Sequence, residues 1–161
     1  MIEIRPAAAG ETAALVDCHL ACWREAYREY ASEAYLANVS GGRSARISYW
    51  TTKIDNGRAP WLALDDGEVI GLADAGPTED DDLRPGLELF MIYVRAAHWG
   101  AGVGHRLLEA AIGDQPASLW VLDGNDRAVG FYRRHGFRPD GARKLHPGFR
   151  RPIIRMIRGR S

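Results

Sequence analysis

The feature that most restricts how this chain can fold is a buried strand followed closely by three glycines and a helix. Residues 87–94 form a nearly continuous apolar run, which predicts a strand that is buried on both faces. Gly100, Gly102 and Gly104 come next, and a helical pattern of apolar residues begins at Val103. A strand, a short connection and a helix in this order favour an α/β fold.

The other elements are predicted from the spacing of apolar residues and from turn residues. Helices are expected over residues 11–30, 32–36, 43–54 and 126–135. Asn125 is expected to cap the last of these, and Gly136 to end it. Strands are expected over residues 2–5, 61–64, 68–75, 118–122, 137–145 and 153–158. The order of these elements predicts a mixed α/β sheet with helices on its faces.

Composition and charge exclude several classes of function. The chain has 161 residues, enough for one domain, and its 21 basic residues balance its 21 acidic ones. Proteins that bind nucleic acid or a membrane surface usually carry a basic excess, so neither partner is expected. Cys18 and Cys22 cannot form a disulfide framework, and no spacing indicates a metal site. With no signal region or membrane span in the sequence, a cytoplasmic protein is expected.

The glycine-rich segment is a candidate phosphate site. Glycines allow backbone amides to approach a ligand, and the first turn of a helix presents unpaired N–H groups. The alternative is a turn that only packs the helix against the sheet. A P-loop is excluded, because Gly104-His105-Arg106 lacks the required Lys-Ser/Thr ending. A dinucleotide site remains open, because Asp123 follows at about the 20-residue distance of a ribose-binding acid.

Two blocks of sequence together resemble the GCN5-related N-acetyltransferase (GNAT) family. Residues 87–94 and 98–108 resemble its acyl-CoA signature, a strand ending in Tyr-Val followed by R/Q-x-x-G-x-G/A. Farther along the chain, Asn125, Ala128, Tyr132 and Gly136-Phe137 resemble the family's N-x-x-A-x-x-x-Y-x-x-x-G-F pattern. The two blocks cover about residues 87–137. The sequence departs from the signature at Trp99, where the family usually has Arg or Gln, and at Ala96, where it often has Pro.

The resemblance implies a single N-acetyltransferase domain over residues 1–161. Its fold would be a central mixed sheet of six to seven strands flanked by about four to five helices. Acetyl-CoA would be the co-substrate, with no metal, in a cleft where strands 87–94 and 118–122 splay apart. Backbone groups of Ile92 and Val94 would bond the pantetheine, and backbone amides over 100–105 would hold the pyrophosphate. The cofactor-binding residues implied are Ile92, Tyr93, Val94, Trp99, Gly100, Ala101, Gly102, Val103, Gly104, His105, Asn125 and Tyr132.

The resemblance also implies two catalytic residues. Glu88 matches a position where many members carry a glutamate that deprotonates the amine through water; the alternative is a solvated residue at a strand end. Tyr132 matches the tyrosine that protonates the leaving thiolate; the alternative is a core tyrosine. Asn125 could contact the pantetheine or serve only as a helix cap.

The acceptor is expected to be a small-molecule primary amine. A protein or peptide N-acetyltransferase is the next candidate, and a non-catalytic acyl-CoA-binding module is another, suggested by Trp99. A homodimer is compatible with the family. The aromatic stripe Trp23, Tyr27, Tyr30 and Tyr35 is expected to be core, with a cation–π wall of the acceptor site as the alternative. The acidic run over 79–82 is expected to be a solvated loop rather than an attractor for a basic substrate.

Overall fold

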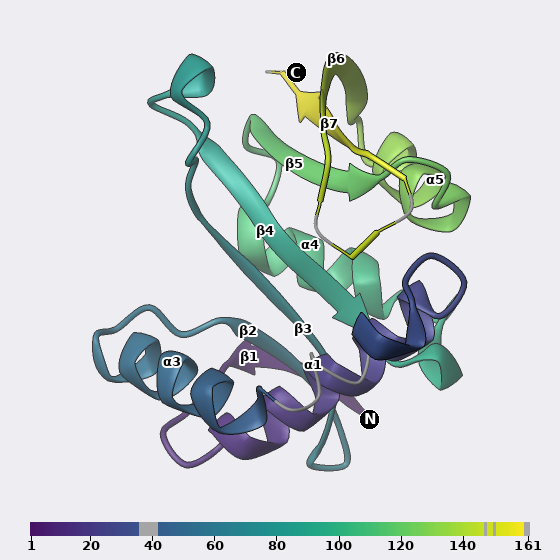
Figure 1. Ribbon diagram of the computed structural model, residues 1–161. Coiled ribbons are helices and arrows are strands. Elements are labelled where there is room, and N and C mark those ends of the chain that lie inside the picture. The colour runs from purple at the N-terminus through teal and green to yellow at the C-terminus, as the bar shows by residue number, and fades with distance from the viewer. Residues whose placement is uncertain (36–41, 147, 150, 160–161) are drawn as a thin grey trace.

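A mixed sheet of seven strands forms the centre of the computed structural model, which describes residues 1–35, 42–146, 148–149 and 151–159 (Figure 1). The strands are β1 (Ile2–Pro6), β2 (Trp61–Asp65), β3 (Glu68–Pro77), β4 (Leu87–Val94), β5 (Ala117–Leu122), β6 (Arg138–Lys144) and β7 (Ile153–Arg158). Their spatial order is β1-β2-β3-β4-β5-β7-β6. Among these strands β4 and β5 pair in parallel, and the other neighbours pair antiparallel. The predicted mixed sheet is confirmed.

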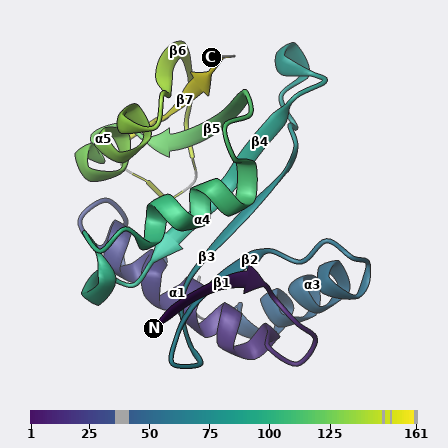
Figure 2. The same cartoon turned by 180° about the vertical axis from the view of Figure 1, so that it is seen from behind.

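Helices cover both faces of this sheet. Helix α1 (Thr12–Tyr27) packs on one face of β3 and β4, and α3 (Arg43–Asp55) packs against α1, so that apolar side chains of both helices join one buried cluster. Helices α4 (Val103–Ile112) and α5 (Asp126–Arg134) lie on the opposite face, which is turned to the viewer in Figure 2. No helix in the described part of the chain has the length and apolar content needed to span a bilayer.

The largest difference between predicted and observed element boundaries is at the end of the first helix. The helix expected over 11–30 ends at Tyr27, so Tyr30 lies beyond it. Residues 33–35 are helical, in line with the helix expected over 32–36, and Leu36 lies outside the described residues.

The central parallel pair is joined only at its beginning. Glu88 aligns with Ser118 and Leu89 with Leu119, and the described pairing of β4 with β5 stops there. At the same point the register of β4 against β3 shifts, so that Phe90 has no partner residue on β3. A bulge of this kind bends a strand and increases its twist. The two strands therefore separate toward their carboxyl ends, as Figure 1 shows.

The acidic run over 79–82 is mostly exposed, as expected of a solvated loop, but two of its carboxylates are bonded to the sheet. Arg155 of β7 donates to Asp82 at 2.7 and 2.8 Å and to Asp140 at 2.7 Å, and it approaches Asp80 at 3.4 Å. The indole nitrogen of Trp120 also donates to Asp80, at 2.9 Å. The expectation is wrong for Asp80, whose side chain is only 16% exposed, because its partners lie 40 and 75 residues away in sequence.

Candidate functional site

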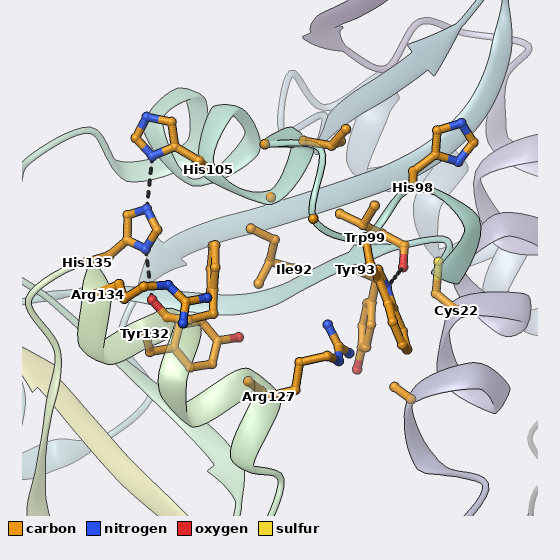
Figure 3. A pocket seen from close by; sticks show the side chains of 18 residues that line it. Cys22, Ile92, Tyr93, His98, Trp99, His105, Arg127, Tyr132, Arg134 and His135 are labelled. Carbon is orange, nitrogen blue, oxygen red and sulfur yellow. Dashed lines mark hydrogen bonds between the residues drawn. The ribbon is translucent and has the colours of Figure 1, made fainter.

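A cavity of about 520 Å³ opens where β4 and β5 separate (Figure 3). Its walls come from the end of β4, the loop and first turn of α4, the length of α5, and two residues of α1. The predicted site residues that line it are Ile92, Tyr93, Val94, Trp99, Gly100, Gly102, Val103, Gly104, His105 and Tyr132. Ala101, Asn125 and Glu88 are not among its lining residues.

The free edge of β4 presents backbone hydrogen-bonding groups to this cavity. The Arg95 amide donates to the Ile70 carbonyl at 2.8 Å, which places Arg95 in a hydrogen-bonded pair with β3. Because such pairs alternate along antiparallel strands, the N–H and C=O groups of Ile92 and Val94 point away from β3 and toward the gap. An extended ligand could therefore bond to β4 in the way an added strand would.

The loop before α4 places several backbone amides at the wall of the cavity. Gly100 and Gly102 have φ values of +79° and +82°, a left-handed conformation that strongly favours glycine. Gly102 is the N-cap of α4, and no described side chain caps the helix there. The amides of the first helical turn, beginning at Val103, consequently lack partners within the helix. Together with the helix dipole they form a site that suits an anion.

The charged residues around the cavity carry one sign. None of its lining residues in the described part of the chain is an aspartate or glutamate, whereas the lining includes Arg127, Arg134, His98, His105 and His135. Of these, His98 contacts a carboxylate from outside the cavity, at 3.3 Å from Asp65. Because the whole chain has no net charge, this concentration of basic groups is local and favours an anionic ligand.

Trp99 and Arg127 form a stacked pair in the wall of the cavity. The Trp99 indole nitrogen donates to the Val94 carbonyl at 2.7 Å, which fixes the ring. The guanidinium carbon of Arg127 lies 3.6 Å from the centre of that ring, within cation–π range. Burial lowers the pKa of Arg127, and within the described residues its guanidinium has neither a hydrogen-bond acceptor nor a carboxylate partner.

Tyr132 lies on α5 and is buried, with 9% of its surface exposed. Its ring packs against Phe131 and Phe137, with centroids 5.5 and 6.0 Å apart. Burial raises the pKa of Tyr132, Tyr27 raises it further, and the nearby Arg127 opposes the shift. Tyr132 therefore keeps its proton at neutral pH and can act as a hydrogen-bond donor and a proton donor in the cavity.

Asn125 caps α5, because its side-chain oxygen accepts from the Ala128 amide at 3.4 Å. It lines a second cavity, of about 570 Å³, on the other side of Trp99 and Arg127, which belong to both linings. Asp123, the acid on which a dinucleotide site depends, instead pairs with Arg143 at 2.7 Å and does not line the first cavity.

Glu88 lies at the joined end of β4 and β5 and is 7% exposed, which excludes the alternative of a solvated residue at a strand end. One oxygen, Oε1, accepts from the Thr78 hydroxyl at 2.8 Å and from the Glu79 amide at 3.3 Å. Ser118, its neighbour on β5, has a buried hydroxyl without a partner among the described atoms. The structure therefore does not bring Glu88 and Tyr132 into one cavity wall.

The aromatic residues of the N-terminal segment pack on one another. The ring of Trp23 lies 4.9 Å from Tyr27 and 5.4 Å from Tyr35, and Tyr27 lies 5.0 Å from Phe149 of the segment before β7. Tyr30 stands apart from these contacts and donates to the Gly124 carbonyl at 3.4 Å. The four side chains of the stripe are half-buried, so most of them pack on one another beside the core, and not within it as had been expected.

Sequence reasoning missed several residues of α5 and its C-cap that line the cavity, namely Arg127, Phe131, Arg134 and His135. A signal for them existed in the helical spacing. Steps of four and three residues lead from Ala128 through Tyr132 to His135, and the same steps lead from Arg127 through Phe131 to Arg134. The two rows form one broad helix face, so the placement of Tyr132 fixes the placement of the others.

Comparison with known proteins agrees with this geometry. The model of the acetyltransferase (GNAT) family matches residues 13–137. A probable N-acetyltransferase of Mycobacterium tuberculosis is 28% identical over 146 residues, which cover 87% of this chain and 82% of that protein. An uncharacterized N-acetyltransferase of Mycobacterium bovis is 30% identical over 135 residues, covering 80% of this chain and 81% of the other.

Two solved structures share the fold. The PaiA N-acetyltransferase of Thermoplasma acidophilum, crystallised in complex with coenzyme A, superposes with a TM-score of 0.78 at 18% identity and covers 99% of each chain. YncA of Salmonella typhimurium, a protein described as a putative acetyltransferase with its cofactor acetyl-CoA, gives a TM-score of 0.71 at 18% identity over 100% of this chain and 95% of that one.

Proposed function

Because this chain belongs to the acetyltransferase (GNAT) family, we propose that it transfers the acetyl group of acetyl-CoA directly to a primary amine of a small molecule. The observation that carries the proposal is the cavity beside β4, whose described lining combines an open helix start with basic side chains and no carboxylate. Coenzyme A has an anionic diphosphate and an amide-rich arm. Both find complementary groups in this cavity, the first at α4 and the second along β4.

The residues proposed to hold the cofactor act mainly through their backbones. Amides over 100–105 would bind the diphosphate, and the free groups at the edge of β4, those of Ile92 and the Val94 amide, would bond the pantetheine. Arg127 would supply the cation that Trp99 lacks, because the indole holds the guanidinium against the cavity without neutralising it. The proposal treats residues 1–161 as one domain with its site within a single chain, so the site does not require a homodimer.

The chemistry follows from these positions. The nitrogen of the neutral amine attacks the thioester carbonyl carbon, a C–N bond forms and the C–S bond breaks. The Ile92 amide would stabilise negative charge on the carbonyl oxygen, as oxyanion donors do. Tyr132 would give its proton to the departing thiolate, and the proton released by the amine would pass through water to a base, for which Glu88 is the candidate. The proton lost by Tyr132 returns from solvent, so the reaction balances.

A small amine as acceptor is supported by the second cavity, which adjoins the first across Trp99 and Arg127. Its volume of about 570 Å³ lies within the range of small-ligand sites. Glu29, Asp126 and Tyr30 contribute to its lining and could hold a cationic amine, while Arg28 offers a contact for an anionic group on the same molecule.

The proposal is tested by following thiol release from acetyl-CoA in the presence of a panel of polyamines, amino acids, aminoglycosides and peptides. We expect release to depend on a small amine and the product to carry one acetyl group. Tyr132→Phe should lower kcat by about 100-fold, because a proton donor is lost, with little change in the Kd for acetyl-CoA.

Three outcomes would contradict the proposal in different ways. Binding of acetyl-CoA without turnover of any amine would indicate a non-catalytic module. Turnover only with peptides would indicate a protein N-acetyltransferase. An unchanged kcat in Tyr132→Phe would remove Tyr132 from the acid role.

A further inference from the structure

Two histidines from different elements are hydrogen-bonded to each other at the rim of the cavity. His105 lies in the first turn of α4, and His135 immediately follows α5, 30 residues later. Nδ1 of His105 is 2.9 Å from Nε2 of His135, and Nδ1 of His135 is 2.8 Å from the Phe131 carbonyl oxygen. Figure 3 shows the two hydrogen bonds in succession, as dashed lines on either side of the His135 ring.

The bonds determine where the hydrogens lie when both rings are neutral. A carbonyl oxygen can only accept, so Nδ1 of His135 carries the hydrogen of its bond to Phe131. A neutral His135 then has a lone pair on Nε2, and the hydrogen between the two rings must come from Nδ1 of His105. In this state the remaining nitrogen, Nε2 of His105, has no hydrogen and is an acceptor.

One added proton converts Nε2 of His105 from a hydrogen-bond acceptor into a donor and leaves both hydrogen bonds of the pair intact. If His105 is the cation, both of its nitrogens carry hydrogen. If His135 is the cation, its Nε2 donates to Nδ1 of His105, and the hydrogen of the neutral His105 ring moves to Nε2. In either case Nε2 of His105 becomes a donor at the rim. A second proton would set two N–H groups against each other and break the bond between the rings.

The charged groups around the pair favour an anion there. Arg134 lines the same cavity, and Arg158 of β7 donates to the His135 carbonyl at 3.3 Å. On α4, Glu109 lies one turn after His105, and Arg106 is directed to the Ile2 carbonyl at 3.1 Å. Cations therefore outnumber carboxylates near the pair, so that a ligand with negative charge would stabilise the added proton.

We propose that the His105–His135 pair binds a phosphate group of coenzyme A in its singly protonated form, so that cofactor binding takes up a proton. The proposal rests on the proposed function, because it requires the cofactor in this cavity. His105 would contact the phosphate, and His135 is a positioning residue that fixes the ring of His105 and shares the proton. The phosphate is either the diphosphate or the 3′-phosphate, since both present the same chemistry at the rim.

The test is calorimetric titration of coenzyme A from pH 6.0 to 8.5, in buffers of different ionisation enthalpy so that proton uptake is measured directly. The wild-type protein should bind coenzyme A about tenfold more tightly at pH 6.0 than at pH 8.5, as expected for one hydrogen bond to a charged group. His105→Asn and His135→Phe should flatten this pH dependence and reduce the proton uptake. His146→Asn, a histidine outside the cavity lining, is the matched control and should keep both.

Dephospho-CoA identifies the phosphate and removes the titration of the ligand's own phosphate monoester. If the difference between wild type and His105→Asn persists with dephospho-CoA, the pair binds the diphosphate; if it vanishes, the pair binds the 3′-phosphate.

Equal pH dependence in wild type and His105→Asn, with coenzyme A still bound, would overturn the inference. A His135→Phe protein that binds less tightly at every pH with unchanged proton uptake would overturn the positioning role. Should His135→Phe not fold, His105→Asn decides alone. Absence of coenzyme A binding at any pH would instead contradict the proposed function.

Discussion

Two arginines of this protein, Arg155 and Arg127, are used in opposite ways. The Arg155 side chain is 8% exposed and contacts Asp80, Asp82 and Asp140, and the hydrogen bonds to Asp82 contribute most to raising its pKa. Arg127 stacks on Trp99 and has no carboxylate partner among the described residues, and burial lowers its pKa. The charge of Arg155 is neutralised by carboxylates of the fold, whereas the charge of Arg127 is left available for an anionic ligand.

The difference distinguishes a structural arginine from a binding arginine. The three carboxylates around Arg155 join the β3–β4 connection to β6 and β7, so this arginine links segments far apart in sequence. Arg127 joins nothing by ion pairing, and its stacking partner only orients it. Replacement of Arg155 should therefore lower the stability of the fold, and replacement of Arg127 should weaken ligand binding.

The largest expected effect is that of Arg155→Met on stability. It leaves the largely buried Asp80 and Asp140 without this counter-charge, and removing one partner of a buried ion pair typically costs about 3 kcal/mol or more. We expect the free energy of unfolding, measured by urea titration, to fall by that amount. Arg127→Met is the matched control and should change it by less than about 0.5 kcal/mol. Equal losses of unfolding free energy in Arg155→Met and Arg127→Met would contradict the distinction between a structural and a binding arginine.

The next effect is that of Arg127→Met on cofactor affinity. Loss of one hydrogen bond to a charged group costs about 1.5 kcal/mol, so the Kd for acetyl-CoA should rise about tenfold. The loss should shrink as salt is added, because the contact is electrostatic. Arg127→Lys should recover part of it. A Kd that Arg127→Met leaves unaltered would show that the guanidinium does not face the cofactor.

The smallest effect concerns a second neutralised arginine, Arg5, which donates to Glu11 at 2.6 and 2.9 Å. Arg5 and the Ala8 amide lower the pKa of Glu11 from 4.5 to about 2. The stabilisation is therefore present above about pH 4.5 and is lost as the pH falls toward 2. Glu11→Gln should lower the urea midpoint slightly at pH 7 and by clearly less at pH 2, where Glu11 is partly protonated in the folded protein. A loss of the same size at both values would mean that ionisation of Glu11 is not involved.

Much of the fold and of the site was predictable because the relevant signals are local. The apolar run of β4, the glycines before α4 and the Asn125 cap of α5 each lie within a few residues of what they determine, and the structure has all three elements. The rest depended on partners distant in sequence. The burial of Asp80 was missed because its partner Arg155 lies 75 residues away. Arg127 and His135 become cavity residues only when α5 folds against α4 and β4.

The central claim is that the cavity beside β4, and not the Arg155 network, receives the cofactor. Titration of isotope-labelled protein with acetyl-CoA, followed by NMR, tests it directly. The account predicts that the amide signals of Ile92 and of residues 100–105 and the side-chain Nε signal of Arg127 shift together to saturation, while the Nε signal of Arg155 stays in place. Saturable shifts confined to the Arg155 network, or no shifts at all, would contradict it.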